Sequence, residues 1–347
     1  MYKAIVKIYF TFIISLAFVA GCNSQEEQTF HSFDDHFEYV ESITPDSITY
    51  YAPRHLDVRD DGAFLITNQR RTDVFLYNQS GNLIRDLSEE AKESHPGINW
   101  SPDKAFFDKE GEVFVYNNIP WGIRFTRDGI YKETTPEELT ISRHVDVDHE
   151  GNFYSIFSHP NNKTEIKKLS PDGEEFASFG EFPDRFRNVM QRFNVGNHLV
   201  VSDDYIFYKT IASPKIYKHR PDGSFVGSFE EEPAFYSRPT SDIRSLREVS
   251  AGEVGQDVQH FAENYTYTES IHILSDDLLL VQYQRAGDDG ILGVQVLTKE
   301  GEFLPGSGVV ISPRKVLAAR NGKIYTIDTD DEDGIVTAID VYRFEYE

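Results

Sequence analysis

Residues 54–81 read RHLDVRDDGAFLITNQRRTDVFLYNQSG, and this stretch decides the fold. It holds three short runs rich in aliphatic, aromatic and β-branched residues, separated by polar segments. Gly62 and Gly81 stand in two of its turns. Glycine accepts the positive φ angles of hairpin turns, and aromatic and β-branched side chains favour strands. The stretch therefore predicts three antiparallel strands, with a fourth after Gly81.

The same alternation of turns recurs along the whole chain. One class of turn contains Gly62, Gly111, Gly151, Gly196, Asp277 and Gly322, and the other contains Gly81, Gly129, Gly173, Gly223 and Gly301. Two hairpin turns in each period of about 45 residues make four strands, which is typical of a propeller blade. Six turns of the first class predict an all-β fold, a six-bladed β-propeller with four antiparallel strands per blade.

The last repeat has room for only three strands, at 315–319, 323–327 and 337–344. A further strand-like run, His36–Ile43, precedes the first blade. Pairing this run with the last blade would supply its outer strand and remove an open sheet edge. We expect the last blade to be closed by this N-terminal strand.

The interval from Gly196 to Asp277 is much longer than the period, and the additional residues fall at about 230–267. Ser245–Phe261 has a partly helical pattern of apolar residues, so we expect one or two short helices there. A long insertion on a repeat scaffold either marks the binding face or covers the propeller mouth. The sequence leaves both alternatives open.

The first 22 residues have the pattern of an address signal. Lys3 and Lys7 precede an apolar run, Ile8–Val19, and small residues lead to Cys22. The run is too short for a transmembrane helix. We expect a signal peptide at 1–21, a lipidated Cys22 with a flexible tether over 22–33, and the propeller at 34–347. Val19-Ala20-Gly21-Cys22 resembles the bacterial lipobox, which implies diacylglycerol on the Cys22 thiol and anchoring in a membrane.

Composition excludes several classes of function. Cys22 is the only cysteine, so the chain has neither an internal disulfide framework nor a cysteine-based metal cluster. The net charge of −24 repels nucleic acid, which we exclude as a partner. Asn23, where many inner-membrane lipoproteins have Asp, favours an outer-membrane lipoprotein on the periplasmic side or at the cell surface.

The blade segments also match one another directly. Arg54-His55-Leu56-Asp57-Val58 in blade 1 corresponds to Arg143-His144-Val145-Asp146-Val147 in blade 3. Together with the turn repeat, this pattern resembles NHL-type six-bladed propellers, in particular the lipoprotein propellers common in Bacteroidetes. The resemblance covers Phe37 to the C-terminus, and it implies an architecture more specifically than a function.

Propellers have two loop faces, and ligands usually bind at the face opposite the glycine turns. Arginine and tryptophan there suit an anionic or sugar-like ligand. The predicted ligand-binding residues are Arg54, His55, Arg70, Arg71, Trp121, Arg143, His144 and Arg285. The alternative is that these arginines pair with local acids. The glycine-turn face is instead acidic.

Sequence motifs of enzymes are mostly absent. His55 and His144, with a third histidine, are a possible metal site of the kind found in propeller lyases, but a repeated structural role explains them equally. Asp328, Asp330, Asp331 and Asp333 lack the glutamate that completes a calcium loop, so an exposed turn is the better interpretation. We expect no cofactor, no metal and no catalytic residue.

The sequence thus predicts a membrane-anchored binding or scaffold module, which engages a ligand or protein over its loop face. The partner is a small molecule, a glycan or an envelope protein, besides the membrane that the lipid anchor enters. The alternative function is a metal-dependent, lactonase-like hydrolase or lyase with its site at the central channel. A third hypothesis is an assembly partner of an envelope complex that uses the acidic face.

Overall fold

The strands and helices of the propeller unit lie within His31–Glu347. The computed structural model describes residues 31–46, 50–51, 53–68, 73–98, 100–117, 122–134, 145–158, 164–180, 198–211, 213–230, 232–233, 235–238, 251–285, 287, 292–304, 310–328, 335–336 and 338–345.

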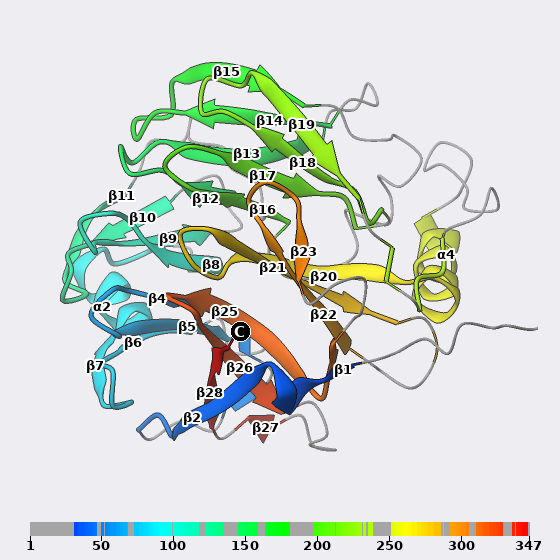
Figure 1. Ribbon diagram of the computed structural model, residues 1–347. Helices are drawn as coiled ribbons and strands as arrows, with labels where there is room; N and C mark the ends of the chain where they lie inside the picture. The colour runs from blue at the N-terminus through cyan, green and yellow to red at the C-terminus, as the bar shows by residue number, and fades with distance from the viewer. Residues whose placement is uncertain are drawn as a thin grey trace, which may run out of the picture. The chain divides into compact units, whose positions relative to one another are not determined.

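Six blades follow one another in a ring, so the predicted six-bladed β-propeller is confirmed (Figure 1). Five of the blade sheets have four antiparallel strands, and the sheet of blade 5 has two additional short strands. Blade 1 contains β4 (Pro53–Val58), β5 (Phe64–Asn68), β6 (Val74–Tyr77) and β7 (Leu83–Asp86). Blade 2 contains β8 (Pro102–Phe107), β9 (Val113–Asn117), β10 (Gly122–Phe125) and β11 (Tyr131–Thr134). Blade 3 contains β12 (Val145–Val147), β13 (Phe153–Ser158), β14 (Thr164–Leu169) and β15 (Glu175–Phe179).

The second half of the ring repeats this order. Blade 4 contains β16 (Leu199–Val201), β17 (Ile206–Lys209), β18 (Ile216–His219) and β19 (Phe225–Phe229). Blade 5 contains β20 (Tyr267–Ile273), β21 (Leu278–Gln284) and β22 (Leu292–Thr298), and β22 pairs with both β23 (Phe303–Leu304) and β24 (Val310–Ser312). Blade 6 contains β25 (Arg314–Arg320), β26 (Lys323–Asp328), β28 (Ile339–Phe344) and β2 (Phe37–Ile43).

The N-terminal strand closes the ring, as predicted from a last repeat with room for only three strands. β2 pairs antiparallel with β28, from Phe37 opposite Phe344 to Ile43 opposite Ile339. Before it, the 3-10 helix η1 (Phe33–Asp35) places Phe33 in a stacked contact with Phe37. β1 (His31–Ser32) extends blade 5 by pairing parallel with β24. The start of the chain thereby joins the last two blades, and β2 covers the edge of β28.

Apolar side chains fill the seams between blades. Six buried clusters match the six seams of the ring. In β5, Leu65 faces blade 2, whereas Phe64 and Ile66 face blade 6. Side chains alternate across a strand, so a strand between two seams is apolar on both sides and buries every residue. Full burial of each such side chain contributes about 2 kcal/mol, which explains the continuous apolar runs in the sequence.

Glycine turns allow neighbouring blades to interlock at the outer edge. At Gly223, with φ of +86°, an added Cβ would lie 2.8 Å from the ring of Phe179 in the preceding blade. At Gly301, with φ of +96°, it would lie 2.7 Å from the ring of Phe229. The outer strand of blade 3 thus ends under the turn of blade 4, and that of blade 4 under the turn of blade 5.

Two helices and one small sheet lie outside the blade pattern. β3 (Tyr50–Tyr51) pairs with β27 (Ile335–Val336). α4 (Ala251–Asn264) lies in the insertion where short helices were predicted, and it leads into the inner strand of blade 5 at the face opposite the glycine turns (Figure 1). α2 (Leu87–Ser94) was not predicted, although Asp86 followed by Glu89 is a typical helix start. The Asp86 carboxylate accepts hydrogen bonds from the backbone N–H groups of Ser88 and Glu89.

Candidate functional site

A pocket of about 650 Å³ opens at the glycine-turn end of the central channel. The first strand of each blade lines this channel, and the pocket is enclosed where these strands end and turn. All six blades contribute lining residues, from Leu56–Asp60 in blade 1 to Ala318–Asn321 in blade 6. Its volume falls in the range of about 300 to 1,000 Å³ that is usual for small-molecule sites. It is therefore the candidate site of the described part of the chain.

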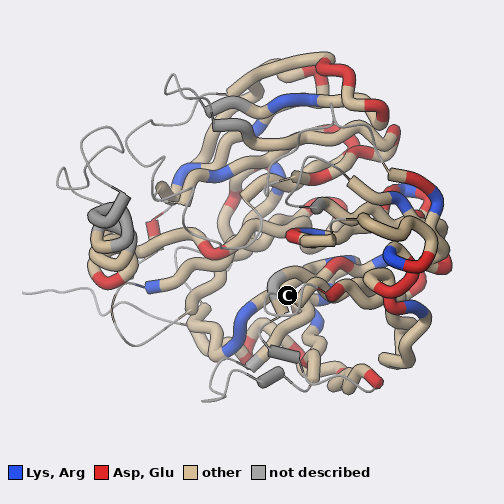
Figure 2. Tube along the Cα trace, turned by 180° about the vertical axis from the view of Figure 1, so that it is seen from behind, with Lys and Arg blue, Asp and Glu red and all other residues tan. Residues whose placement is uncertain are grey.

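The pocket is strongly acidic. Nine Asp or Glu side chains line it, against five Lys or Arg. In Figure 2, the acidic turns gather on the side of the ring where the inner strands end. Asp203 and Asp204 follow β16 at the rim, and both are exposed. The potential of this opening favours positively charged groups.

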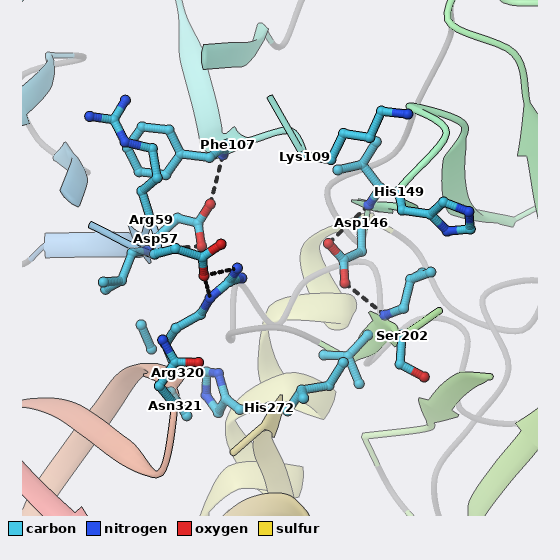
Figure 3. A pocket seen from close by; sticks show the side chains of 18 of the residues that line it. Asp57, Arg59, Phe107, Lys109, Asp146, His149, Ser202, His272, Arg320 and Asn321 are labelled. Atoms are coloured by element: carbon cyan, nitrogen blue, oxygen red, sulfur yellow. Dashed lines mark hydrogen bonds and ion pairs between the residues drawn. The ribbon is translucent and has the colours of Figure 1, made fainter. Parts of the chain in front are cut away.

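The repeated sequence Arg-His-x-Asp-Val places one aspartate at equivalent points of blades 1 and 3. Asp57 accepts a hydrogen bond from the backbone N–H of Phe107 in blade 2, at 2.7 Å, and another from its neighbour Val58. Asp146 likewise accepts from Val201 in blade 4, at 2.8 Å, and from Val147. Each carboxylate therefore ties its own blade to the next and keeps both oxygens hydrogen-bonded. The two line different sides of the pocket (Figure 3).

Removal from water shifts the titration of both carboxylates. Burial raises the pKa of Asp57 to about 6, while the hydrogen bond from Phe107 and the positive charge of Arg320 oppose the shift. Burial also raises the pKa of Asp146, against the attraction of Lys104. Because burial disfavours the charged form, both groups gain from any positive charge that enters the pocket.

Lysines bridge two other seams below the pocket. Lys104 of blade 2 donates a hydrogen bond to the carbonyl of Val145 in blade 3. Lys209 of blade 4 donates to the hydroxyl of Tyr283 in blade 5, at 3.1 Å. Burial lowers the pKa of both amines. Carboxylates and lysines thus alternate as bridges along the first four seams.

Blade 5 has a histidine where blades 1 and 3 have their aspartates. His272 lies opposite Leu280, as Asp57 lies opposite Leu65. It is 5% exposed, and its Nε2 shares a hydrogen bond of 2.8 Å with the hydroxyl of Ser270. Burial and the nearby charge of Lys104 lower the pKa of His272 to about 3, so the ring is neutral at physiological pH.

Arginines at the pocket are already engaged by acids of the turns. Arg320 binds the carboxylate of Asp60 across the seam between blades 6 and 1, at 2.6 Å. Arg59 and Arg127 both bind Asp61, at 2.8 and 2.7 Å. These two ion pairs hold the pKa of Asp61 below its ordinary range. The guanidinium groups therefore hold the rim of the pocket together.

Most of the residues predicted to bind a ligand lie outside the described residues. This applies to Arg70, Arg71, Trp121, Arg143, His144 and the lipidation site Cys22. The backbone of Arg54 lies in β4, His55 is half-buried in the same strand, and Arg285 is exposed after β21. Neither His55 nor Arg285 lines the pocket at the glycine-turn end of the channel, which we call the turn-face pocket. Their role as ligand-binding residues stays a prediction.

Sequence reasoning missed the residues that line the inner pocket. Asp57 and Asp146 belong to the repeated motif, but only the arginines and histidines of that motif were predicted to bind a ligand. The signal was available, because a carboxylate at the same place in two blades requires a common partner, and the neighbouring blade supplies it. His272 and Lys104 carry no such repeat, so only the assembled ring identifies them.

The described residues contain neither a metal-binding cluster nor a candidate membrane-spanning helix. Among these, no group of three His, Asp, Glu or Cys side chains lies close enough to hold a metal ion. Asp328 ends β26, and the other three aspartates of its acidic turn fall outside the described residues. Within the same residues, no helix has the length and apolar character needed to cross a membrane.

Comparisons with known proteins identify the fold. No family model and no curated protein matches the chain. A protein described as exported from Bacteroides fragilis is similar in structure, with a TM-score of 0.65 and 10% identity over 92% of this chain and 98% of that one. A member of the DUF4221 family from Bacteroides vulgatus has a TM-score of 0.53 and 9% identity over 90% of this chain and 100% of that one. At such identities the similarity shows a shared fold alone, in agreement with the resemblance to Bacteroidetes propellers.

Proposed function

We propose that this propeller is an extracytoplasmic binding module whose ligand enters the turn-face pocket. The observation that carries this proposal is the pocket itself, which all six blades enclose on the axis. Its polar groups, Asp57, Asp146 and His272, are held by the inner strands, which are the most constrained part of each blade. Rigid, convergent polar groups in a concave site are typical of ligand recognition.

Anchoring through Cys22 belongs to the same proposal. Several acyl chains would hold the module at the outer membrane, because each buried methylene adds about 0.8 kcal/mol. Cys22→Ala should then release the protein from the membrane fraction and abolish labelling by radioactive palmitate. Unchanged partition and labelling would contradict the anchor without touching the pocket.

Binding is favoured over the alternative of a metal-dependent hydrolase or lyase. No observation on the described residues supports that chemistry, since their histidines and carboxylates do not gather into a group of three. The inner carboxylates are also committed to backbone N–H groups of the next blade. Such groups suit the recognition of a ligand better than proton transfer.

Blocking the pocket tests this function. Ser275 lines the pocket on the turn after β20 and is half-buried, so Ser275→Trp should fill its mouth. Wild-type protein isolated from its own cells should release a small molecule on denaturation, detected by mass spectrometry, that Ser275→Trp protein lacks. Ser80→Trp is the matched control, because Ser80 is exposed in a turn on the same face but outside the pocket.

Arg285→Trp separates the two faces. Arg285 is exposed at the opposite end of blade 5. If Arg285→Trp removes the bound molecule and Ser275→Trp does not, the binding site lies on the loop face and the proposal is wrong. A wild-type protein that releases no molecule would contradict it as well.

A further inference from the structure

The inner carboxylates of the pocket carry charge without a direct counter-ion. Within the described residues, Asp57 and Asp146 form no ion pair, and their hydrogen bonds all come from backbone N–H groups. Lys104 and Arg320 act on them only over a distance. Both carboxylates are half-buried, and a partly desolvated carboxylate without an ion pair is stabilised by a positively charged group that approaches it.

His272 adds a second, independent indication of a ligand. It is 5% exposed, it lines the pocket, and its Nε2 is occupied by Ser270. Its Nδ1 is not one of the enclosed atoms that lack a partner, so this nitrogen is accessible from the pocket. The ring is neutral, and Nδ1 can therefore accept a hydrogen bond from a positively charged group that enters there.

The positive side chains of the pocket argue against an anion. Arg320, Arg59 and Arg127 are bound by Asp60 and Asp61. Lys109 and Lys299 also line the pocket, but an anion bound to them would face its nine acids. A positively charged group meets no such obstacle, and the rim concentrates it.

We propose that the pocket binds a small organic cation, with its ammonium or guanidinium groups drawn to Asp57 and Asp146 on different sides of the pocket, near His272. This rests on the proposed function, because it takes the turn-face pocket as the binding site. An organic cation fits better than a bare metal ion, because no three His, Asp, Glu or Cys side chains of the described residues form a metal-binding group. A charged group on a carbon chain can approach both carboxylates while its methylenes contact Phe107 and Val201.

The same geometry makes binding depend on pH. The charged groups that act on Asp57 are Lys104, Arg320 and Asp146, with Asp60 bound to Arg320. Because burial raises the pKa of Asp57 to about 6, this carboxyl takes up a proton in mildly acidic solution and its attraction for a cation is lost. Near pH 6, where this carboxyl is partly protonated, cation binding should release a fraction of a proton from the pocket.

Three probes with the same carbon chain test the charge of the ligand. They are 1,5-diaminopentane, the neutral 1,5-pentanediol and the dianion glutarate, measured by calorimetry against the purified protein. We expect diaminopentane to bind at least about tenfold more tightly than pentanediol near pH 7.5, and glutarate not to bind. Diaminopentane affinity should fall about tenfold near pH 5, and Ser275→Trp should abolish binding. Calcium chloride at equal ionic strength controls for general screening.

Variants locate the interaction. Asp57→Asn and Asp146→Asn should each weaken diaminopentane binding by about tenfold, whereas Asp277→Asn, an equal charge change outside the pocket, should leave it within about twofold. Should a variant fail to fold, the pH series on the wild type decides. If pentanediol or glutarate binds as well as diaminopentane in a manner that Ser275→Trp abolishes, the cation inference falls and the binding function stands. A diaminopentane affinity that is absent, or that Asp277→Asn reduces equally, also overturns it.

Discussion

Carboxylates bridge the seams between blades 1 and 2 and between blades 3 and 4, whereas lysines bridge the two seams that alternate with them. Asp57 and Asp146 use both oxygens on backbone N–H groups. Lys209, by contrast, is fully buried, and its amine makes a single hydrogen bond within the described residues, to the hydroxyl of Tyr283. The two kinds of bridge occupy equivalent places in the ring. In the carboxylate bridge both oxygens accept hydrogen bonds, whereas the amine of Lys209 donates only one.

The two kinds of bridge should therefore differ in how much the stability of the fold depends on them. Backbone N–H groups at the ends of inner strands have no partner within their own blade, so the aspartates satisfy donors that would otherwise be buried and unpaired. An amine without a full set of acceptors brings a desolvation cost of its own. The carboxylate bridges should therefore be required for stability, and the Lys209 bridge should be replaceable by an apolar side chain.

The largest effect should come from Asp146→Ala. Val201 loses its acceptor, and an orphaned buried donor costs about 1 to 3 kcal/mol. Lys104 also loses the carboxylate that contributes most to keeping it protonated. We expect the free energy of unfolding, measured with urea, to fall by about 3 kcal/mol.

Asp172→Ala is the matched control, since Asp172 is exposed in a turn of the same blade. Its effect should stay within about 0.5 kcal/mol. Equal losses in the two variants would show that the bridge to blade 4 contributes nothing specific.

Local patterns in the sequence were enough to predict the architecture. Turn glycines at a regular spacing and apolar runs such as Phe64–Ile66 define strands, and the count of turns identifies β2 as the closing strand. These signals are local or additive, so they survive without knowledge of tertiary contacts. α2 was missed because its helical signal is a single turn long and begins where a strand ends.

The pocket could not be predicted in the same way. Asp57, Asp146 and His272 are separated by long stretches of chain, and they line one pocket only because the blades close into a ring. Their pKa shifts depend on burial, which a sequence does not display. The site predicted at the opposite face was based on arginines whose placement depends on loops. Loops have the weakest sequence pattern from which a structure can be predicted.

An effect of opposite sign is expected for Lys209→Met. Methionine has a similar length and needs no acceptors, so it removes the desolvation cost of the amine while keeping the contact with Tyr283. We expect the free energy of unfolding near pH 7 to rise by about 1 to 2 kcal/mol in urea melts. The advantage should shrink at high pH, because burial lowers the pKa of Lys209 and the unfolded chain alone then carries the proton. A clear loss of stability would mean that this bridge is as necessary as the carboxylates.

The smallest effect concerns the titration of Asp57. An unfolded aspartate titrates near about 3.9, and burial raises the pKa of Asp57 to about 6 in the folded protein. Between these values the folded chain holds the proton, so the stabilisation is complete below the unfolded pKa and is lost as pH rises through the folded pKa. The stability of the wild type relative to Asp57→Asn should therefore fall by about 1 kcal/mol from pH 5 to pH 6 in urea melts. Asp61→Asn gives the opposite trend, because Arg59 and Arg127 lower the pKa of Asp61 and its stabilisation is lost on acidification. Parallel trends for the two aspartates would refute the distinction between a buried carboxylate without a counter-ion and one held in ion pairs.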